Sequence, residues 1–168
     1  MQTKEILIKN FKNVQRGTDF ILKAIPTNKL DYTPTKEMKK LGELAFHIAT
    51  LPLTARYFSE NEFKERPERD TILKLFSEKY GADLTKNNYS AIFAKSCEYF
   101  LNLFEKKDNN QFINGTFSNF IYRNTTSFLE LFLSTEDHIV QHRGTLFAYL
   151  RTLNIPVTMQ QYFGFKEL

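Results

Sequence analysis

The sequence contains few of the residues that build a disulfide scaffold or a fold rich in strands and turns. Its 168 residues include one cysteine, no tryptophan, six glycines and five prolines. A single cysteine excludes an internal disulfide and is typical of a reducing cytosol, so a cytoplasmic protein is expected. The scarcity of glycine and proline argues against a β-rich fold.

Long apolar runs and charge of one sign are also lacking. No stretch approaches the ~18 apolar residues that a membrane span requires. Residues 1–10 alternate charged and apolar side chains, without the apolar segment of a secretory signal. The formal net charge is +4, and basic residues alternate with acidic ones, as in residues 64–70. Because nucleic-acid binding needs clustered basic residues or a recognisable reading motif, we expect neither a membrane nor a nucleic-acid partner.

The apolar residues that are present recur every three to four positions in four segments, a pattern that predicts amphipathic helices. A chain of 168 residues is long enough to bury one sizeable core. We therefore expect an all-α fold, a four-helix bundle forming a single domain over residues 1–168. The predicted helices span about residues 3–25, 35–58, 85 or 88 to 107, and 125–153, with a shorter helix at 69–80 and a tail at 157–168.

Only three histidines occur, and each falls within a predicted helix. His138 and His142 stand four residues apart in the fourth helix, which places their Cβ atoms roughly 5–6 Å apart on one face. At that spacing two imidazole nitrogens can bind one ion at about 2.0–2.1 Å each. His47 lies in the second helix, and bundles place metal ligands on facing helices in their interior. The sequence thus predicts a metal site between helices two and four.

A histidine pair at this spacing also occurs on many helices as a solvated or hydrogen-bonded pair. The apolar residues that surround all three histidines favour the metal site, because a buried imidazole nitrogen needs a partner. Three neutral imidazoles suit one divalent transition metal ion, with Zn or Ni ranked first and Fe, Mn or Cu as alternatives. Three protein ligands leave a position for water or substrate, as in catalytic sites.

For several residues expected near the histidines, the sequence allows either a role in the site or a purely structural role. Cys97 is either a fourth ligand or reactive thiol, or part of the core. Glu43 either orients the histidine one turn further on or caps its helix. Glu136 and Asp137 either accept a histidine N–H or lie at the surface. Tyr149 either lines the pocket or packs in the core with its hydroxyl satisfied.

Two further residues follow His142 directly. Arg143 is rotated off the ligand face, so pairing with a neighbouring carboxylate is expected for it. Gly144 costs roughly 1 kcal/mol of helix propensity relative to alanine. A close helix–helix crossing would account for that glycine.

Several segments together resemble the DinB-like (DNA-damage-inducible, YfiT-related) family of metal-binding four-helix bundles, over nearly the whole chain. They are Ile25-Pro26, Leu30-Asp31-Tyr32 with Pro34, Leu41 to Ile48, and His138-x-x-x-His142-Arg143-Gly144 followed by Tyr149-Leu150-Arg151 and Ile155-Pro156. The resemblance implies one ligand histidine on helix two and two on the last long helix, at the positions of His47, His138 and His142.

The resemblance also implies an activity. Characterised members use the metal to activate a low-molecular-weight thiol, which implies a metal-dependent thiol S-transferase or related hydrolase acting on an electrophilic small molecule. Gln141, Thr145 and Tyr32 depart from the residues common in the family and leave the substrate open. The rival expectation is a non-catalytic, metal-stabilised module for stress response or binding. Members are commonly homodimers, and the aromatic segments 117–120 and 162–165 add apolar surface, so a homodimer is expected.

Overall fold

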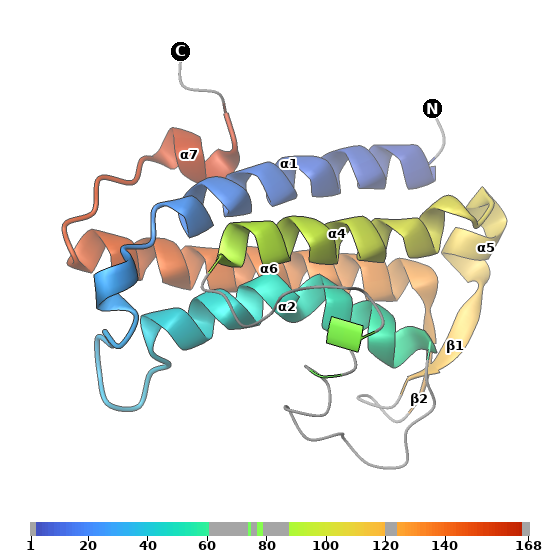
Figure 1. The fold of residues 1–168 in the computed structure, drawn as a ribbon. Helices are drawn as coiled ribbons and strands as arrows, with labels where there is room; N and C mark the ends of the chain where they lie inside the picture. The colour runs from blue at the N-terminus through green and yellow to red at the C-terminus, as the bar shows by residue number, and fades with distance from the viewer. Residues whose placement is uncertain (1–2, 61–73, 75–76, 79–87, 120–123, 166–168) are drawn as a thin grey trace.

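The computed structural model describes residues 3–60, 74, 77–78, 88–119 and 124–165. Its long helices run in two directions, α1 and α6 in one and α2 and α4 in the other (Figure 1). Both α1 and α2 pack against α4 and α6. This arrangement confirms the all-α four-helix bundle and makes α2 and α6 neighbours. The four helices are α1 (Thr3–Lys23), α2 (Leu41–Glu60), α4 (Tyr89–Glu105) and α6 (Phe128–Thr152).

Shorter elements connect and flank the long helices. They are η1 (Thr27–Lys29), α5 (Asn109–Asn114), β1 (Thr116–Asn119), β2 (Asn124–Ser127) and α7 (Met159–Phe163). The strands pair antiparallel, with Thr116 opposite Ser127 and Asn119 opposite Asn124. Neither strand is predicted by the sequence pattern, because four residues are too few for an alternation of apolar and polar side chains to stand out. The helix predicted at residues 69–80 lies almost entirely outside the described residues.

The bounds of α6 follow from its end residues. Ser127 Oγ accepts a hydrogen bond from Glu130 N at 3.1 Å, and Glu130 Oε2 accepts one from Ser127 N at 2.8 Å. This reciprocal capping box satisfies two backbone donors at the start of the helix. Beyond its end, Asn154 has a φ of 58°, the left-handed conformation that asparagine tolerates after a helix. The predicted limits of the fourth helix are therefore close to the observed ones.

Helix α2 begins at Leu41 rather than near Thr35, where the sequence pattern places its start. Leu41 N donates to Tyr32 O at 2.8 Å, so the preceding loop folds back over the first turn. Glu43 Oε2 accepts from Lys40 N at 3.0 Å. These contacts satisfy helix-start donors that have no partner within the helix. Of the two roles open to Glu43, the capping role is the one observed.

The core near α5 is built from phenylalanine rings contributed by four helices. The ring centroids of Phe100, Phe104 and Phe132 lie between 4.9 and 5.8 Å from one another. These distances are within the range at which aromatic rings attract each other. The rings are fully buried. This cluster closes one end of the bundle independently of the histidines. Its members are Phe11 of α1, Phe100 and Phe104 of α4, Phe112 of α5 and Phe132 of α6.

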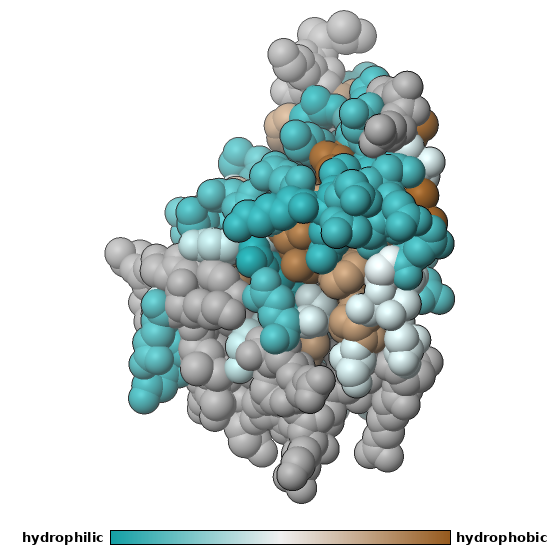
Figure 2. Space-filling model, turned by 90° about the vertical axis from the view of Figure 1, so that its right-hand side faces the viewer, coloured by the Kyte–Doolittle hydropathy of each residue, from teal (hydrophilic) through white to brown (hydrophobic). Residues whose placement is uncertain are grey.

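Exposed apolar side chains gather on the C-terminal segment. Seen from the α5 end, hydrophilic residues cover much of the described surface, with smaller hydrophobic areas between them (Figure 2). The most exposed large hydrophobic side chains of the described residues are Met159, Phe163 and Phe165, at 51, 51 and 62%. Phe117, in contrast, is half-buried and packs on Phe128 at a centroid distance of 5.4 Å. Within the described parts of the chain, no helix combines the length and hydrophobicity needed to cross a membrane.

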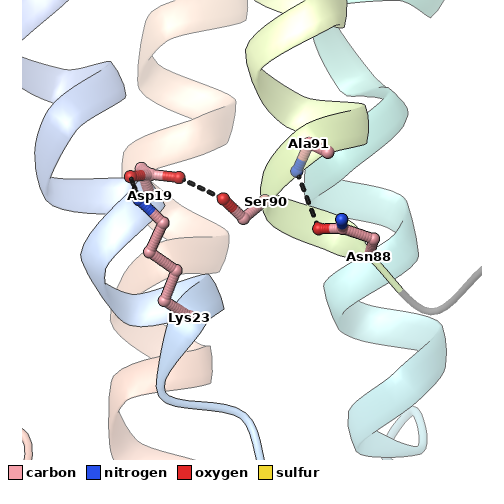
Figure 3. A network of polar contacts seen from close by, with 5 residues as sticks. All are labelled: Asp19, Lys23, Asn88, Ser90 and Ala91. Carbon is pink, nitrogen blue, oxygen red and sulfur yellow. Dashed lines mark hydrogen bonds and ion pairs between the residues drawn. The ribbon is translucent and has the colours of Figure 1, made fainter.

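A polar network joins α1 to the start of α4 (Figure 3). Of the two starts predicted for this helix, near residue 85 or 88, the second is observed: Asn88 caps α4, because its Oδ1 accepts from Ala91 N at 3.1 Å. Ser90 Oγ donates to Asp19, which also pairs with Lys23 Nζ at 2.6 Å. A groove of about 550 Å³ runs beside this network. It lies between α1 and α4, whereas the three histidines belong to α2 and α6.

The C-terminal residues form α7, which packs on α1. Arg143 of α6 lies beneath it, almost fully buried, and its Nη1 donates to Val14 O at 3.2 Å. Its guanidinium lies 4.3 Å from the centroid of the Tyr162 ring, a cation–π contact. The expected carboxylate pairing is absent, since Arg143 forms no ion pair with any residue that the structure describes. A carbonyl and a ring from other elements bind this guanidinium instead.

Gly17 is the glycine that this packing requires. A Cβ added there would lie 2.4 Å from Tyr162 O, so α7 would have to move. We expect Gly17→Ala to lower the free energy of unfolding by about 1–3 kcal/mol, the usual cost of overpacking. Urea denaturation followed by circular dichroism measures this.

Gly144→Ala is the matched control, because it places the same methyl group on a mid-helix glycine. Its Cβ would meet only the Tyr162 hydroxyl oxygen, at 3.5 Å, an ordinary contact. The close approach expected at Gly144 is therefore found at Gly17. We expect this variant to gain up to ~1 kcal/mol from helix propensity. Equal stability of the Gly17→Ala variant and the unmodified protein would contradict the description of this contact.

Candidate metal centre

The three histidines are held by buried neighbours on two packed helices. His47 lies on α2 between Leu44 and Ile48, which are 2 and 0% exposed. His138 and His142 lie on α6, where Ile139 is fully buried. The buried residues fix the faces of the two helices that meet. The histidines, at the edge of that contact, remain half-buried.

Their Nε2 atoms converge. Nε2 of His138 lies 2.9 Å from Nε2 of His142 and 3.4 Å from Nε2 of His47. Ligand nitrogens of all three lie within 4.8 Å of one another. Two nitrogens bound to one tetrahedral ion at about 2.0–2.1 Å are about 3.3–3.4 Å apart. The three histidines therefore have the spacing to hold one metal ion.

Hydrogen bonding satisfies this arrangement less well than a cation does. Each Nε2 carries either one proton or one lone pair. Nε2 of His138 faces two other nitrogens, so it can form only one strong hydrogen bond. A metal ion accepts lone pairs from all three atoms at once. The donor set is also chemically suitable, since neutral imidazole is a ligand for Zn, Ni, Fe and Cu.

The electrostatic surroundings keep two of the imidazoles neutral. Burial lowers the pKa of His138. Burial also lowers the pKa of His142, with further contributions from His138 and from the ammonium of Lys39. A pKa below the ordinary histidine value leaves the ring unprotonated at pH 7. The Nε2 lone pairs are thus available without prior loss of a proton.

No fourth protein ligand joins the cluster among the described residues, whether histidine, cysteine or carboxylate. Cys97 of α4 is fully buried within the hydrophobic core, and burial raises the pKa of its thiol well above the usual range. Of the alternatives expected for Cys97, the structure shows the one in which it is part of the core. Three protein ligands leave a tetrahedral ion one further position, which a water molecule or a small molecule can take.

The two acidic residues before His138 point elsewhere. Glu136 is buried and accepts a hydrogen bond from Asn10 Nδ2 of α1, so it lies on the face of α6 turned toward α1. Burial raises its pKa, while Asn10 opposes that shift. Asp137 is exposed. Neither Glu136 nor Asp137 therefore joins the histidine cluster, which was one of the roles expected for them.

Tyr149 lies on the histidine face of α6 without contributing a ligand. Its ring is buried against Tyr32, with centroids 6.1 Å apart. Its hydroxyl donates to the carbonyl of Lys39 at 3.0 Å. Lys39 lies in the loop before α2, and its carbonyl meets Tyr149 through a tertiary contact that the sequence does not predict. No local pattern indicates such a position.

Comparison with known proteins gives the fold. No family model matches the sequence, and no curated protein matches it. Solved structures do match, among them a DinB-like protein, YjoA, from Bacillus subtilis, with a TM-score of 0.61 and 17% identity over 90% of this chain and 96% of that one. A protein from Exiguobacterium sibiricum ascribed to the DinB family matches with a TM-score of 0.68 and 15% identity over 96% and 99%. The chain therefore has the fold of the DinB-like proteins.

Proposed function

We propose that His47, His138 and His142 bind one divalent transition metal ion and that the protein is a metal-dependent thiol S-transferase. The observation that carries the proposal is the convergence of three Nε2 atoms from two helices, with no fourth ligand among the described residues. Zn or Ni is proposed first, and Fe, Mn or Cu would suit the same donors. The transferase activity is supported by the family resemblance and by the lack of a fourth ligand among the described residues, which leaves a position for a thiol.

The residues of the chain would bind and orient the reactants. When bound, a divalent metal supplies Lewis acidity that lowers the pKa of a coordinated water or thiol. The reaction would be a displacement in which the thiol sulfur bonds to the electrophilic carbon. The bond to the leaving group breaks with its electron pair, and the thiol proton passes to solvent. Because the histidines are half-buried and not fully enclosed, a small thiol would have access to them.

The rival function is a non-catalytic, metal-stabilised module for stress response or binding. It predicts the same metal content and the same histidine ligands. The two functions differ in turnover: only a transferase consumes an electrophile in the presence of both thiol and metal. Metal content and turnover must therefore be measured separately.

We also propose that the protein is a homodimer. The support is the exposed apolar surface formed by Met159, Phe163 and Phe165, because contiguous exposed apolar patches commonly mark interfaces. The other aromatic segment, 117–120, gives less support, since Phe117 is packed against the core.

The metal proposal predicts close to one transition metal per chain in untagged protein, measured by elemental analysis. His138→Ala and His142→Ala should each lose most of it, because two imidazoles hold the ion far more weakly than three. Gln141→Ala is the matched control: its side chain is exposed on the same turn of α6, and the variant should keep its metal. Full metal content in the His47→Ala, His138→Ala double variant would refute the ligand assignment.

Chelation should leave the fold intact. The aromatic core and the capping box of α6 contain none of the three histidines, so far-UV circular dichroism should change little. The melting temperature should fall, because a ligand bound only by the native state stabilises it by mass action. Thiol-dependent consumption of an electrophile should disappear and return on adding metal. Unfolding of the metal-free chain at 25 °C would show a structural ion, and full activity of that chain an incidental one.

Light scattering tests the homodimer. We expect a mass near twice the 19.8 kDa of one chain. Phe163→Ser with Phe165→Ser should shift the mass toward one chain, because both exposed rings are removed. Ile6→Ser, which removes an exposed apolar side chain from α1, is the control and should leave the mass unchanged. A single-chain mass at micromolar concentration for the unmodified protein would contradict the proposal.

A further inference from the structure

The groove between α1 and α4 is formed by a pair of helices that carries none of the three histidines. Its volume of about 550 Å³ is in the range of sites that bind small molecules. The α1 wall is polar, because Lys12, Arg16, Asp19 and Lys23 recur every three or four residues along one face of that helix. The other wall is the start of α4.

The α4 wall offers apolar surface. Ala91 and Ala94 are exposed there, and Phe93, buried in the core behind them, also lines the groove. Because alanine ends in a single methyl group, these positions leave space that a longer side chain would fill. A small apolar group can therefore pack on this wall and leave water.

A hydrogen bond between the two helices fixes the groove. Asp19 of α1 and Ser90 of α4 point toward one another (Figure 3). Asp19 accepts from Ser90 Oγ through one carboxylate oxygen and pairs with Lys23 Nζ through the other, at 2.6 Å. The carboxylate thus compensates Lys23 and connects the walls. A preformed groove binds a ligand without first having to be ordered.

Two cations of the lining have no acidic partner. Lys12 and Arg16 stand four residues apart on α1, are both exposed, and form no ion pair with any residue that the structure describes. Arg16 Nη2 donates to Asn13 Oδ1 at 2.7 Å, a neutral group that leaves the charge uncompensated. Among the described residues that line the groove, Asp19 is the only acid. Three cations and one carboxylate give the lining a net charge of +2.

The other carboxylates of the two helices lie outside the groove. Glu5 is two turns before Lys12, about 10 Å along α1. Glu98 pairs with Lys95 at 3.0 Å, and Glu105 is the last residue of α4. Since charges in water are screened over about 8 Å at physiological ionic strength, the groove keeps its positive potential.

We propose that this groove binds a phosphate monoester that carries a small apolar group, at a site additional to the metal cluster. Lys12 and Arg16 bind the phosphate, and the apolar group packs on the α4 wall. Such a phosphate has a charge of about −1.5 to −2 at pH 7, which matches a lining of +2 better than the single charge of a carboxylate does. The planar guanidinium of Arg16 is suited to donate two parallel hydrogen bonds to phosphate oxygens.

Phenyl phosphate is the probe, titrated into ¹⁵N-labelled protein while the amide chemical shifts are followed. We expect saturable shifts in α1 and α4 around Arg16 and Ala91. Phenyl phosphate should bind about tenfold more tightly than inorganic phosphate, which lacks the ring, and than benzoate, which carries one negative charge. Added salt should weaken the binding.

Lys12→Gln and Arg16→Gln should each weaken the binding of phenyl phosphate about fivefold to tenfold, because each removes a charge-assisted hydrogen bond. Both side chains are exposed, so the fold should be unchanged. Lys106→Gln is the matched control. It removes the same charge from an exposed residue at the other end of α4, about 20 Å along the axis from Ala91, and should bind as the unmodified protein does.

Several results would overturn the inference. Absence of saturable binding would exclude the site, and shifts confined to the neighbours of His138 and His142 would place the phosphate at the metal cluster. Equal binding of inorganic phosphate would show an adventitious ion only, and equal binding of benzoate would show that the double charge is not recognised. Unchanged binding in Lys12→Gln and Arg16→Gln, or an equal loss in Lys106→Gln, would also contradict it. Metal content tests the proposed function separately from all of these.

Discussion

The contact between α2 and α6 is the constraint on which the site depends. It brings three Nε2 atoms together, two of them 2.9 Å apart, at the edge of an apolar interface. A shift of α6 by one residue would move a histidine by about 1.5 Å and turn it by about 100°. The buried residues that flank the histidines, Ile48 on α2 and Ile139 on α6, fix this register. A metal ion shared by three histidines would in turn hold the two helices together.

The fold is stabilised largely away from that contact. One end of the bundle is closed by fully buried phenylalanine rings, and α7 is packed on α1 over the buried guanidinium of Arg143. Stability from these regions allows the histidines to remain half-buried and accessible on one side. A site that also had to supply the core would need to be closed. This separation is the structural reason for proposing a functional rather than a structural ion.

The sequence predicts the features that depend on local pattern. Helical periodicity predicts the four helices, with the start of α4 left between residues 85 and 88 and the end of α6 placed at residue 153. The i, i+4 spacing predicts the histidine pair. Features that depend on distant contacts are missed or misplaced. The loop before α2 delays that helix, Gly17 rather than Gly144 lies at the close approach, and Lys39 reaches α6 through Tyr149. The hairpin is missed because its strands are too short to show a period.

We infer that one metal ion is bound by three imidazoles and by no other protein ligand. X-ray absorption spectroscopy of the metal-loaded protein tests it most directly, since ring scattering counts imidazoles and bond lengths separate nitrogen from sulfur. We expect three imidazole nitrogens at about 2.0–2.1 Å from the metal, plus one oxygen ligand from solvent. Addition of a thiol should introduce one sulfur at about 2.3 Å. Fewer than three imidazoles, or a sulfur ligand before thiol is added, would show that His47, His138 and His142 are not together the ligands of the ion.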